Sequence, residues 1–459
     1  MGIRKYKRVC LVSIPLLFAF AFAVPIAVAS DTNDQPGVRF HFSFLIKAGK
    51  TQEALKAFKE LGAYFTDRFK TGSGQIYILK SNERDHLHYF IDYKDKTSFR
   101  KTQSAYRADA EWRAKLYQYL GLYLESSFQY VVYSSITAFA TDNPVADLSQ
   151  GQEGNIFFSS INLGSFREIL AGEGESKPVT ISGTLKIPEG ISGKVPAVII
   201  LHESGGVNDY YFEVADMLNK IGIAAFIVDS LHSRGIGSMR ELLKELFHSY
   251  AIRISDAYAA LELLSTHPKI DRNKIAVLGY SHGGKVALFV ASEKIRNSFI
   301  ADDLRFAASI AYYPSCATQF KDIDFTDAPV LMLLAEKDNI CPIESCLEYA
   351  QRMKESGADI KAVVYKGAHH MFSVLHGDKT TKVPVLPDWS NCGKEELLFL
   401  REDGTWFFPH TNKTVDGVNG IIGDYTANCR IDGGAIVGGN NEAKIESTIE
   451  YQNLLRSLK

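Results

Sequence analysis

Short apolar runs, separated by longer stretches with helical periodicity, recur along the chain from residue 155 onward. The first two, at 155–161 and 179–187, suggest an antiparallel entry into a sheet. Six more are typical of buried strands, and they lie at 195–201, 223–228, 275–278, 307–311, 330–334 and 360–365. Apolar strands that alternate with helices indicate a mostly parallel sheet with helices on both faces. We therefore predict an α/β fold with a doubly wound sheet for residues 155–459.

The first part of the chain follows a different order. Between residues 38 and 136 we expect strands at 38–46, 75–79, 86–93 and 126–134 and helices at 51–69 and 96–120. The resulting order, strand, helix, strand, strand, helix, strand, is that of the ferredoxin-like α+β motif. Together with Trp112 in the second helix, it resembles the dimeric α+β barrel domains. The resemblance implies a role in dimerisation or substrate gathering, with a homodimer as the expected assembly.

His86 and His88 are the polar candidates in this first domain. They alternate along one predicted strand and so share a face of the sheet. Nothing in the sequence pairs with them as a catalytic carboxylate or a ligand would. We therefore expect partly exposed strand histidines rather than a site.

Two other segments differ in composition from the domains. Residues 137–154 are expected to form a linker, because 141–154 is rich in Asp, Asn, Pro and Gly. An insertion at about 374–441 follows the last predicted strand, and it is Gly-rich and bears aromatic residues. We expect this insertion to form a lid or a pocket wall.

Residues 1–29 have the pattern of a secretory signal. Four basic residues precede an almost wholly apolar stretch at 9–24, and Ala27-Val28-Ala29 supplies the small residues of a cleavage site. The alternative is a retained anchor helix, since the apolar stretch is nearly long enough to span a bilayer. Two prolines and the small-residue ending favour cleavage, which predicts export to a periplasmic or extracellular location with no stable membrane span left.

Composition and charge narrow the possible partners. With 46% hydrophobic and 23% charged residues, the chain falls in the globular range. Removal of residues 1–29 takes four basic residues and no acidic ones, so the formal charge changes from −2 to −6. Because binding to a phosphate backbone relies on clustered Lys and Arg, we set nucleic-acid partners aside.

Five cysteines follow the predicted signal, and they are Cys316, Cys341, Cys346, Cys392 and Cys429. In an oxidising compartment they can pair, and the odd number leaves at least one thiol over. We hypothesise that Cys392 pairs with Cys429 and staples the insertion. The sequence has no C-x-x-C, and the close pair Cys341 and Cys346 straddles a proline, so the spacing does not favour zinc.

The most informative motif is Gly279-Tyr280-Ser281-His282-Gly283, which follows one apolar run and precedes an apolar helical pattern. A G-x-S-x-G turn in this setting holds its serine in a strained conformation with the hydroxyl above the sheet edge. Gly279 and Gly283 are needed because side chains would collide across so tight a bend. The following helix points its N-terminal amides at the site, which favours negative charge there. The alternative is a structural serine in a Gly-rich turn.

A serine nucleophile needs a base and an orienting acid, and in α/β-hydrolases these follow in the order Ser, Asp or Glu, His. Asp338 follows the run at 330–334, and Glu336 is its competitor. The E-K-D-x-x-x-P arrangement resembles the acid turn of this superfamily, which favours Asp338. Of two adjacent histidines, His370 is favoured over His369, because G-A-x-H-x-F resembles the histidine loop of dienelactone hydrolases.

The loop after the run at 195–201 reads H-E-x-x-G-x-N from His202 to Asn208, and it closely resembles the corresponding loop of dienelactone hydrolases. The resemblance implies that the backbone N–H of Ser204 completes an oxyanion hole, for which the N–H of His282 is the other expected donor. It also implies that Glu203 interacts with the resting nucleophile. The alternative for Glu203 is a carboxylate satisfied by nearby backbone amides.

Arg234 lies in a second loop, Asp229 to Gly235, that resembles one of exported relatives. There Arg234 could bind an anionic group of a substrate. The alternative is a solvated or structural arginine.

The resemblance covers about residues 155–372 and the final helix at 442–458. The chain differs from the named enzymes at the nucleophile. The named enzymes use cysteine where this chain has Ser281, so activity on a dienelactone cannot be transferred. We expect ester or lactone hydrolysis through an acyl-enzyme on Ser281, with His370 as base and Asp338 as its orienting acid, and without cofactor or metal. Two alternatives stay open: a serine peptidase of the prolyl-oligopeptidase kind, and a non-catalytic binding or assembly protein on the same scaffold.

Overall fold

The computed structural model divides into two compact units, Met1–Asp142 and Asn143–Lys459. In the second unit the structure describes residues 144–458, apart from 171, 173–176, 232–233, 235–245, 323, 385, 394–395 and 416–428. In the first unit it describes the strands and four helical positions, 56, 59, 60 and 63. Each unit contains its own sheets.

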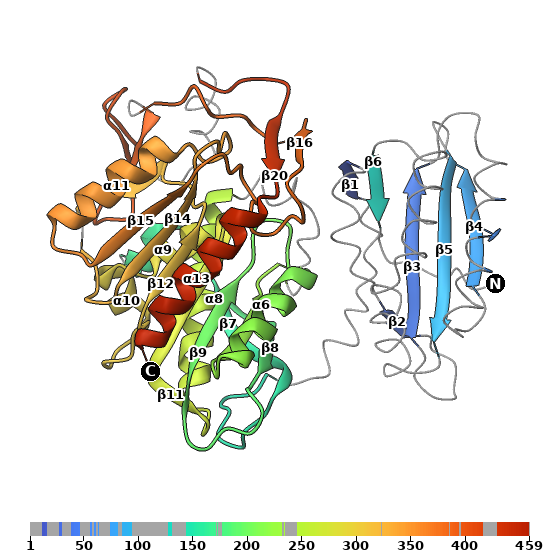
Figure 1. Ribbon diagram of the computed structural model, residues 1–459, viewed down its shortest axis with the longest axis horizontal. Helices are drawn as coiled ribbons and strands as arrows, with labels where there is room; N and C mark the ends of the chain where they lie inside the picture. Colours follow the sequence, from blue (N-terminus) through green and yellow to red (C-terminus); the bar gives the residue numbers. More distant parts are fainter. Residues whose placement is uncertain are drawn as a thin grey trace. The chain divides into compact units, whose positions relative to one another are not determined.

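The second unit is built on one eight-stranded sheet (Figure 1), in the order β15-β14-β12-β11-β9-β10-β8-β7. β8 runs antiparallel to both of its neighbours, and the other neighbouring strands are parallel. Each strand overlaps one of the eight predicted runs, so the predicted α/β fold is confirmed. The bounds are β7 (Gly154–Asn162), β8 (Lys177–Lys186), β9 (Val195–Leu201), β10 (Ala224–Asp229), β11 (Ile270–Tyr280), β12 (Ser309–Tyr312), β14 (Val330–Ala335) and β15 (Ile360–Tyr365).

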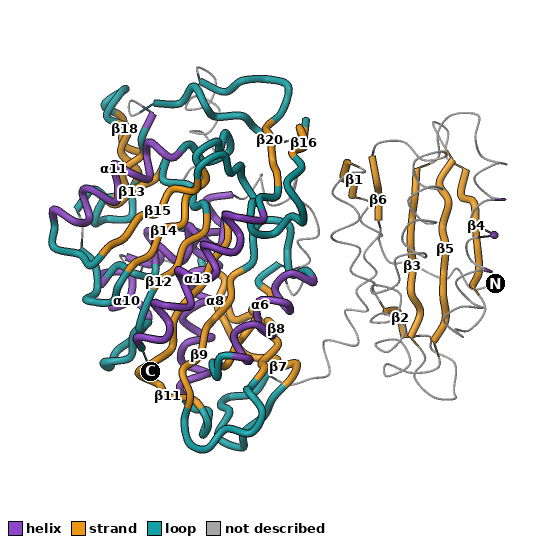
Figure 2. The backbone as a smooth tube through the Cα atoms, viewed as in Figure 1, coloured by secondary structure: helices purple, strands orange, loops and turns teal. Residues whose placement is uncertain are grey.

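Helices cover both faces of this sheet, as the purple and orange segments of Figure 2 show. α6 (Asp209–Lys220) and α13 (Asn441–Ser457) lie on one face. α8 (Leu246–Ser265) and α9 (His282–Phe289) pack against each other on the opposite face. The other helices of the described part are α5 (Phe166–Leu170), α10 (Glu293–Phe299) and α11 (Ile343–Glu355).

Burial along each strand follows from its place in the sheet. β12 and β14 lie inside the sheet with helices on both faces, and all of their residues are buried. β7 is an edge strand, and its buried residues Ile156, Phe158 and Ser160 alternate with less buried ones. A strand covered on both faces needs an apolar residue at every position, whereas a half-covered strand needs one at every second position. The prediction of a buried strand at 360–365 is wrong in this respect, because β15 is the other edge strand and only its last residue, Tyr365, is buried.

The later part of the chain also forms two smaller sheets. β13 (Thr318–Phe320), β17 (Leu398–Leu400), β18 (Trp406–Phe408) and β19 (Lys413–Val415) form one of four strands, and β16 (Thr380–Val383) pairs with β20 (Ala435–Gly438). All of these except β13 lie in the predicted insertion. The hypothesised pair Cys392–Cys429 is a disulfide that closes it. A second disulfide, Cys316–Cys346, was not predicted.

The first unit contains a sheet of four strands in the order β2-β3-β5-β4, with bounds Ala27–Ala29, Val38–Leu45, Asp85–Tyr93 and Gly74–Lys80. All neighbouring strands in it are antiparallel. β6 (Ser127–Tyr130) pairs instead with β1 (Val12–Pro15). The predicted helices at 51–69 and 96–120 lie outside the described residues, apart from the four helical positions. On β5, His86 and His88 stand two residues apart and so share a face of the sheet.

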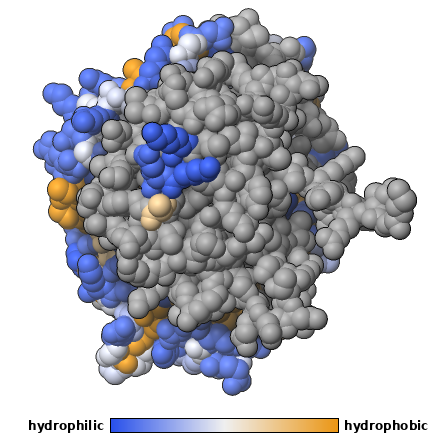
Figure 3. All heavy atoms as spheres, turned by 90° about the vertical axis from the view of Figure 1, so that its right-hand side faces the viewer, coloured by the Kyte–Doolittle hydropathy of each residue, from blue (hydrophilic) through white to orange (hydrophobic). Residues whose placement is uncertain are grey.

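The surface of the described residues is mostly hydrophilic where Figure 3 colours it. Large apolar side chains are exposed at Leu347, Val364, Ile431, Ile445 and Ile449, of which Ile445 and Ile449 lie about one turn apart on α13. A few exposed apolar residues are ordinary on a protein surface. Within the part that the structure describes, no helix combines the length and the apolar character needed to cross a bilayer.

Candidate active site

Ser281 lies at the sharp turn between the end of β11 and the start of α9. Its backbone has φ 50° and ψ −111°, a conformation that residues other than glycine rarely adopt. A Cβ atom at Gly279 would lie 2.0 Å from the carbonyl oxygen of Gly283, so only glycine fits there. The turn is thus the strained strand-to-helix bend expected of a G-x-S-x-G motif.

Two hydrogen bonds join Ser281 to the predicted base and acid. Ser281 Oγ lies 2.9 Å from His370 Nε2, and His370 Nδ1 lies 2.7 Å from Asp338 Oδ2. With Asp338 ionised, Nδ1 carries the proton and Nε2 is left to accept the serine proton. The chain separations are 89 and 32 residues, so the sheet is what brings the three side chains together.

Asp338 is fixed by the backbone of its own loop. Its Oδ1 accepts hydrogen bonds from the N–H groups of Ile340 and Cys341, at 2.9 and 2.8 Å. The carboxylate is buried, with an exposed fraction of 6%. Because these bonds fix Oδ1, the other carboxylate oxygen, Oδ2, stays directed at His370.

His370 is held from a further side by Tyr313, which sequence reasoning missed. The two rings lie 4.8 Å apart between centroids, and the Tyr313 hydroxyl is 2.9 Å from Ser373 Oγ. Tyr313 has φ 35°, so this buried residue occupies a strained backbone position directly after β12. Nothing in the local sequence marks it, because the contact exists only when β12 and the histidine loop are neighbours in space.

The competing residues lie elsewhere. Glu336 accepts a hydrogen bond from the N–H of Gly367 at 2.8 Å in an exposed position. His369 is half-buried, and burial, with the Lys337 charge nearby, lowers its pKa. Ser281 and Asp338 make their hydrogen bonds to His370 and not to His369. The structure therefore places Asp338 and His370 in the positions that the chemistry requires.

The two expected oxyanion donors lie on loops whose backbones touch. A Cβ atom at Gly283 would lie 2.3 Å from the oxygen of Leu201 and 2.6 Å from that of His202, so the nucleophile turn packs directly on the loop that carries Ser204. Within the described part of the chain, the Ser204 N–H donates no hydrogen bond. His282 is the first residue of α9, whose N-terminal amides favour negative charge.

Glu203 is buried and bound within its own loop. Its carboxyl accepts hydrogen bonds from the Gly205 N–H and from Asn208 Nδ2, the latter at 3.2 Å. Burial raises the pKa of Glu203 to about 7, although Gly205, Arg253 and His370 oppose the rise. This arrangement matches the alternative of a carboxylate satisfied by neighbouring amides, and it leaves a group that titrates near neutral pH next to the triad.

Arg234 is a structural arginine rather than an exposed anion-binding group. Its guanidinium makes two 2.7 Å contacts with the carboxylate of Asp256, and its Nε donates to Asn162 Oδ1 at 2.6 Å. Nη1 also donates to the Ser230 oxygen. The side chain is 4% exposed, so Arg234 has little freedom to bind a substrate.

The predicted insertion contacts both loops of the triad. The Gly438 N–H at the end of β20 donates to the His370 oxygen at 3.1 Å. Asn339, which follows Asp338, donates to Asp388 Oδ2 at 2.6 Å and accepts from the Ile436 N–H at 3.0 Å. The insertion thus supports the acid and the base from outside the sheet.

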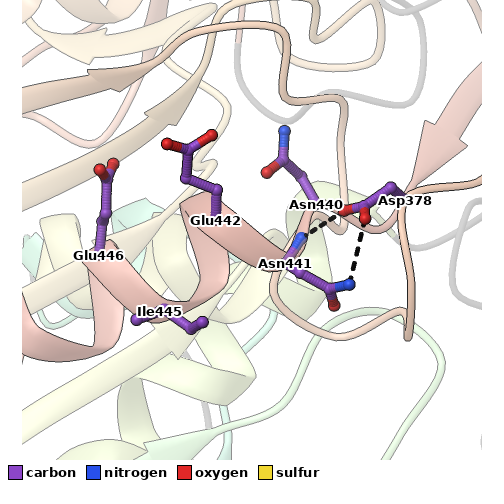
Figure 4. A pocket seen from close by; sticks show the side chains of 6 residues that line it. All are labelled: Asp378, Asn440, Asn441, Glu442, Ile445 and Glu446. Carbon is purple, nitrogen blue, oxygen red and sulfur yellow. Dashed lines mark hydrogen bonds between the residues drawn. The ribbon is translucent and has the colours of Figure 1, made fainter.

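Asp338, Cys341 and His370 are the one group of described residues whose ligand atoms, all within 4.8 Å of one another, could hold a metal ion. In this arrangement Asp338 and His370 bind each other, and a metal would have to break that contact. A separate surface hollow of about 700 Å³ is lined by Asp378 and by the start of α13 (Figure 4). Asp378 there bonds to Asn441, and no triad residue lines the hollow.

The sheet and the triad define the class of this protein, which is a Ser-His-Asp protein of the α/β-hydrolase fold. Residues 181–384 match the model of the dienelactone hydrolase family, so this part of the chain is similar to that family. The matched segment contains Ser204, Ser281, Asp338 and His370.

Individual relatives are distant. "Probable 2-oxo-3-(5-oxofuran-2-ylidene)propanoate lactonase" of a Bradyrhizobium species is 26% identical over 228 residues, which are 46% of this chain and 85% of that protein. A Yersinia pestis protein that carries the name of a carboxymethylenebutenolidase is 25% identical, over 44% of this chain and 77% of that protein. The apo structure of esterase 2 from Thermogutta terrifontis aligns at 18% identity, with a TM-score of 0.34, over 42% of this chain and 81% of that chain.

Proposed function

We propose that this protein hydrolyses carboxylic esters or lactones through an acyl-enzyme on Ser281. The observation that carries the proposal is the pair of contacts at 2.9 and 2.7 Å that joins Ser281, His370 and Asp338. The match to the dienelactone hydrolase family and the relatives named as lactonase and carboxymethylenebutenolidase support an ester or lactone as substrate.

The geometry suggests an order of proton transfers. His370 Nε2 takes the proton from Ser281 Oγ as that oxygen attacks the carbonyl carbon, and Asp338 stabilises the imidazolium that forms. The N–H groups of Ser204 and His282 donate to the oxygen that becomes negative. His370 then protonates the leaving alkoxide, and afterwards it activates the water that releases the acid.

The acyl group is expected to be recognised by shape rather than by an arginine. Arg234 engages Asp256, Asn162 and Ser230 through four of its five N–H donors, and its side chain is only 4% exposed, so it is poorly placed to bind a substrate carboxylate. The serine nucleophile also separates this chain from the cysteine enzymes that it resembles. We therefore propose neutral esters or lactones as the substrate class.

Labelling and a substrate panel test the proposal. A fluorophosphonate probe should label Ser281 of the wild-type protein and leave Ser281→Ala unlabelled. Short-chain nitrophenyl esters and lactones should be turned over, whereas peptide amides should not. Turnover of amides alone would favour the peptidase alternative, and a folded protein that neither labels nor hydrolyses would favour a binding role.

We also propose that the protein is exported and that its first unit mediates pairing. The basic, apolar and small-residue pattern of residues 1–29 and the two disulfides support an oxidising compartment. N-terminal sequencing of the secreted protein should begin at residue 30, and a retained residue 1 would contradict cleavage. Light scattering of the purified protein should give a dimer, and a monomer would contradict pairing.

A further inference from the structure

Arg253 is a buried cation that no step of the proposed mechanism uses. It lies in the middle of α8, it is 0% exposed, and it is among the largest fully buried side chains of the described residues. Its Nε has no hydrogen-bond partner in the described part of the chain, and its guanidinium forms no ion pair there. An unpaired buried charge is costly, so a side chain with only a packing role would be better apolar at this position.

The first contact of Arg253 is with the loop that carries Ser204. Nη2 donates to the backbone oxygen of His202 at 2.5 Å. This is one of the two oxygens against which Gly283 packs. The guanidinium therefore holds the peptide two residues before Ser204. At this point the Ser204 loop meets the nucleophile turn with His282, and we call these two segments the oxyanion loops.

The second contact is with the residue after the nucleophile. Nη1 lies 2.7 Å from Nδ1 of His282, and the face of that imidazole stacks on Tyr250, with 4.2 Å between centroids and 16° between planes. Because the guanidinium can only donate, Nδ1 accepts and the proton of this ring is on Nε2. One guanidinium thus joins the His202 carbonyl to the His282 side chain.

The charge of Arg253 acts in the same region. Burial lowers its pKa to about 10, so the group stays protonated at neutral pH. The carboxylates that oppose this fall are Asp256 and Glu203. Asp256 is already held by Arg234 and by the Ser160 hydroxyl, so Arg253 has no carboxylate as a direct partner, and its positive charge lies beside the His202 carbonyl and the His282 ring.

We propose that Arg253 is a positioning residue that fixes the separation of the Ser204 and His282 N–H groups, the two donors of the oxyanion hole. The inference rests on the proposed ester hydrolysis and adds a residue to it. Donors in an oxyanion hole act only if they are held where the charge develops, and a misplacement of about 1 Å can cost about 100-fold in rate. Arg253 touches no substrate, and its effect passes through the two loops.

Arg253→Met tests this, since methionine fills the space without a charge or donors. We expect kcat for the best nitrophenyl ester to fall about 10- to 100-fold with KM within about twofold of wild type, because the donors act in the transition state. A trifluoromethyl ketone analogue, whose adduct carries an oxyanion, should bind more weakly by the same factor. Lysine can restore one of the two contacts, so Arg253→Lys should fall between wild type and Arg253→Met.

Arg296→Met is the matched control. Arg296 is also a buried arginine that donates to backbone oxygens, those of Leu304 and Asp302, but it lies on α10 and contacts neither oxyanion loop. It should lose thermal stability without a change in analogue affinity. If Arg253→Met behaves like this control, Arg253 is only structural and the inference is wrong.

A double-mutant cycle gives a second measurement if Arg253→Met does not fold. His282→Phe keeps a ring to stack on Tyr250 but cannot accept from Arg253. Combined with Arg253→Lys, its loss of analogue affinity should be less than additive, since both changes remove one shared contact. Additive losses would contradict the link. A wild-type protein that neither hydrolyses esters nor binds the ketone would refute the proposed function itself, and normal wild-type activity with unaffected variants would refute only the role of Arg253.

Discussion

Ser281, His370 and Asp338 come from three different turns, and each turn has its own local cause. Glycines at 279 and 283 allow the serine bend, backbone amides of residues 340 and 341 hold the acid, and Tyr313 packs on the base. At the scale of single residues, the site therefore depends on strained or buried positions rather than on exposed ones. We therefore expect the loss of activity on substitution to differ strongly even between adjacent residues.

The adjacent histidines should differ sharply in function. His370→Ala removes the base that bonds to Ser281, and we expect kcat to fall by about 10³-fold or more. His369→Ala removes a half-buried ring that bonds to neither partner, and kcat should stay within about threefold of wild type. Steady-state kinetics on a nitrophenyl ester, with melting temperatures for both variants, measure this. A fully active His370→Ala would overturn the assignment.

Glu203 should make stability depend on pH near neutrality. Its pKa rises on folding from 4.5 to about 7, so the folded chain binds more protons than the unfolded chain between these values. The free energy of unfolding should therefore fall as pH rises from 4.5 to 7. Glu203→Gln cannot ionise and should gain up to about 3 kcal/mol on wild type across this window.

Denaturant melts of wild type and Glu203→Gln at pH 5, 6, 7 and 8 check this prediction. Glu336→Gln, a change at an exposed carboxylate, is the control and should follow wild type. A constant difference between Glu203→Gln and wild type at all four pH values would show that Glu203 is ionised throughout.

At the scale of elements, the insertion after the histidine loop supports the triad. The β16–β20 pair and the segment around Asp388 contact His370 and Asn339, and the Cys392–Cys429 disulfide closes the same segment. The insertion was predicted to be a lid or pocket wall, and the described residues add a role in bracing two loops. Since 416–428 lie outside the described residues, the lid stays a prediction.

Asn339→Ala should weaken this bracing. It removes the bonds to Asp388 and to the Ile436 N–H, each worth about 1 kcal/mol, and frees the loop that positions Asp338. We expect kcat to fall about tenfold with KM little changed. Asn441→Ala is the control, since it removes a bond to Asp378 in the same region without touching either triad loop. Equal kinetics for the two variants would contradict a bracing role.

At the scale of the whole molecule, all the residues of the site belong to one unit. Asn143–Lys459 has its own eight-stranded sheet, and the acid, base, nucleophile and both oxyanion loops lie within it. The first unit supplies no residue to the described site. Its contribution is therefore expected in assembly or substrate gathering rather than in the chemistry.

A chain that begins at residue 143 should test this division. We expect it to fold, to label with the fluorophosphonate probe, and to hydrolyse a small ester with kcat within about threefold of the full chain. Circular dichroism and ester kinetics on both chains measure this, and Ser281→Ala in the short chain is the control. A short chain that folds but has lost its activity would show that the first unit takes part in catalysis.

The sequence by itself determined the sheet and the triad. Buried parallel strands must be apolar along their whole length, and a nucleophile turn must have its glycines, so both are written locally in the chain. His370 and Asp338 were assigned because the short loops around them resemble the histidine loop of dienelactone hydrolases and the acid turn of the α/β-hydrolase superfamily. The Cys392–Cys429 pairing was a hypothesis of the same local kind.

Tertiary structure decided which long-range partners each residue meets. Arg253 and Asp256 interrupt an apolar helix, which was a signal of buried charge, but only packing shows that Arg234 takes Asp256 and leaves Arg253 to the two oxyanion loops. The Cys316–Cys346 disulfide and the contact of Tyr313 with His370 are of the same kind. Such contacts depend on which strands become neighbours, and neighbours in a sheet are set by the whole fold rather than by any local run of residues.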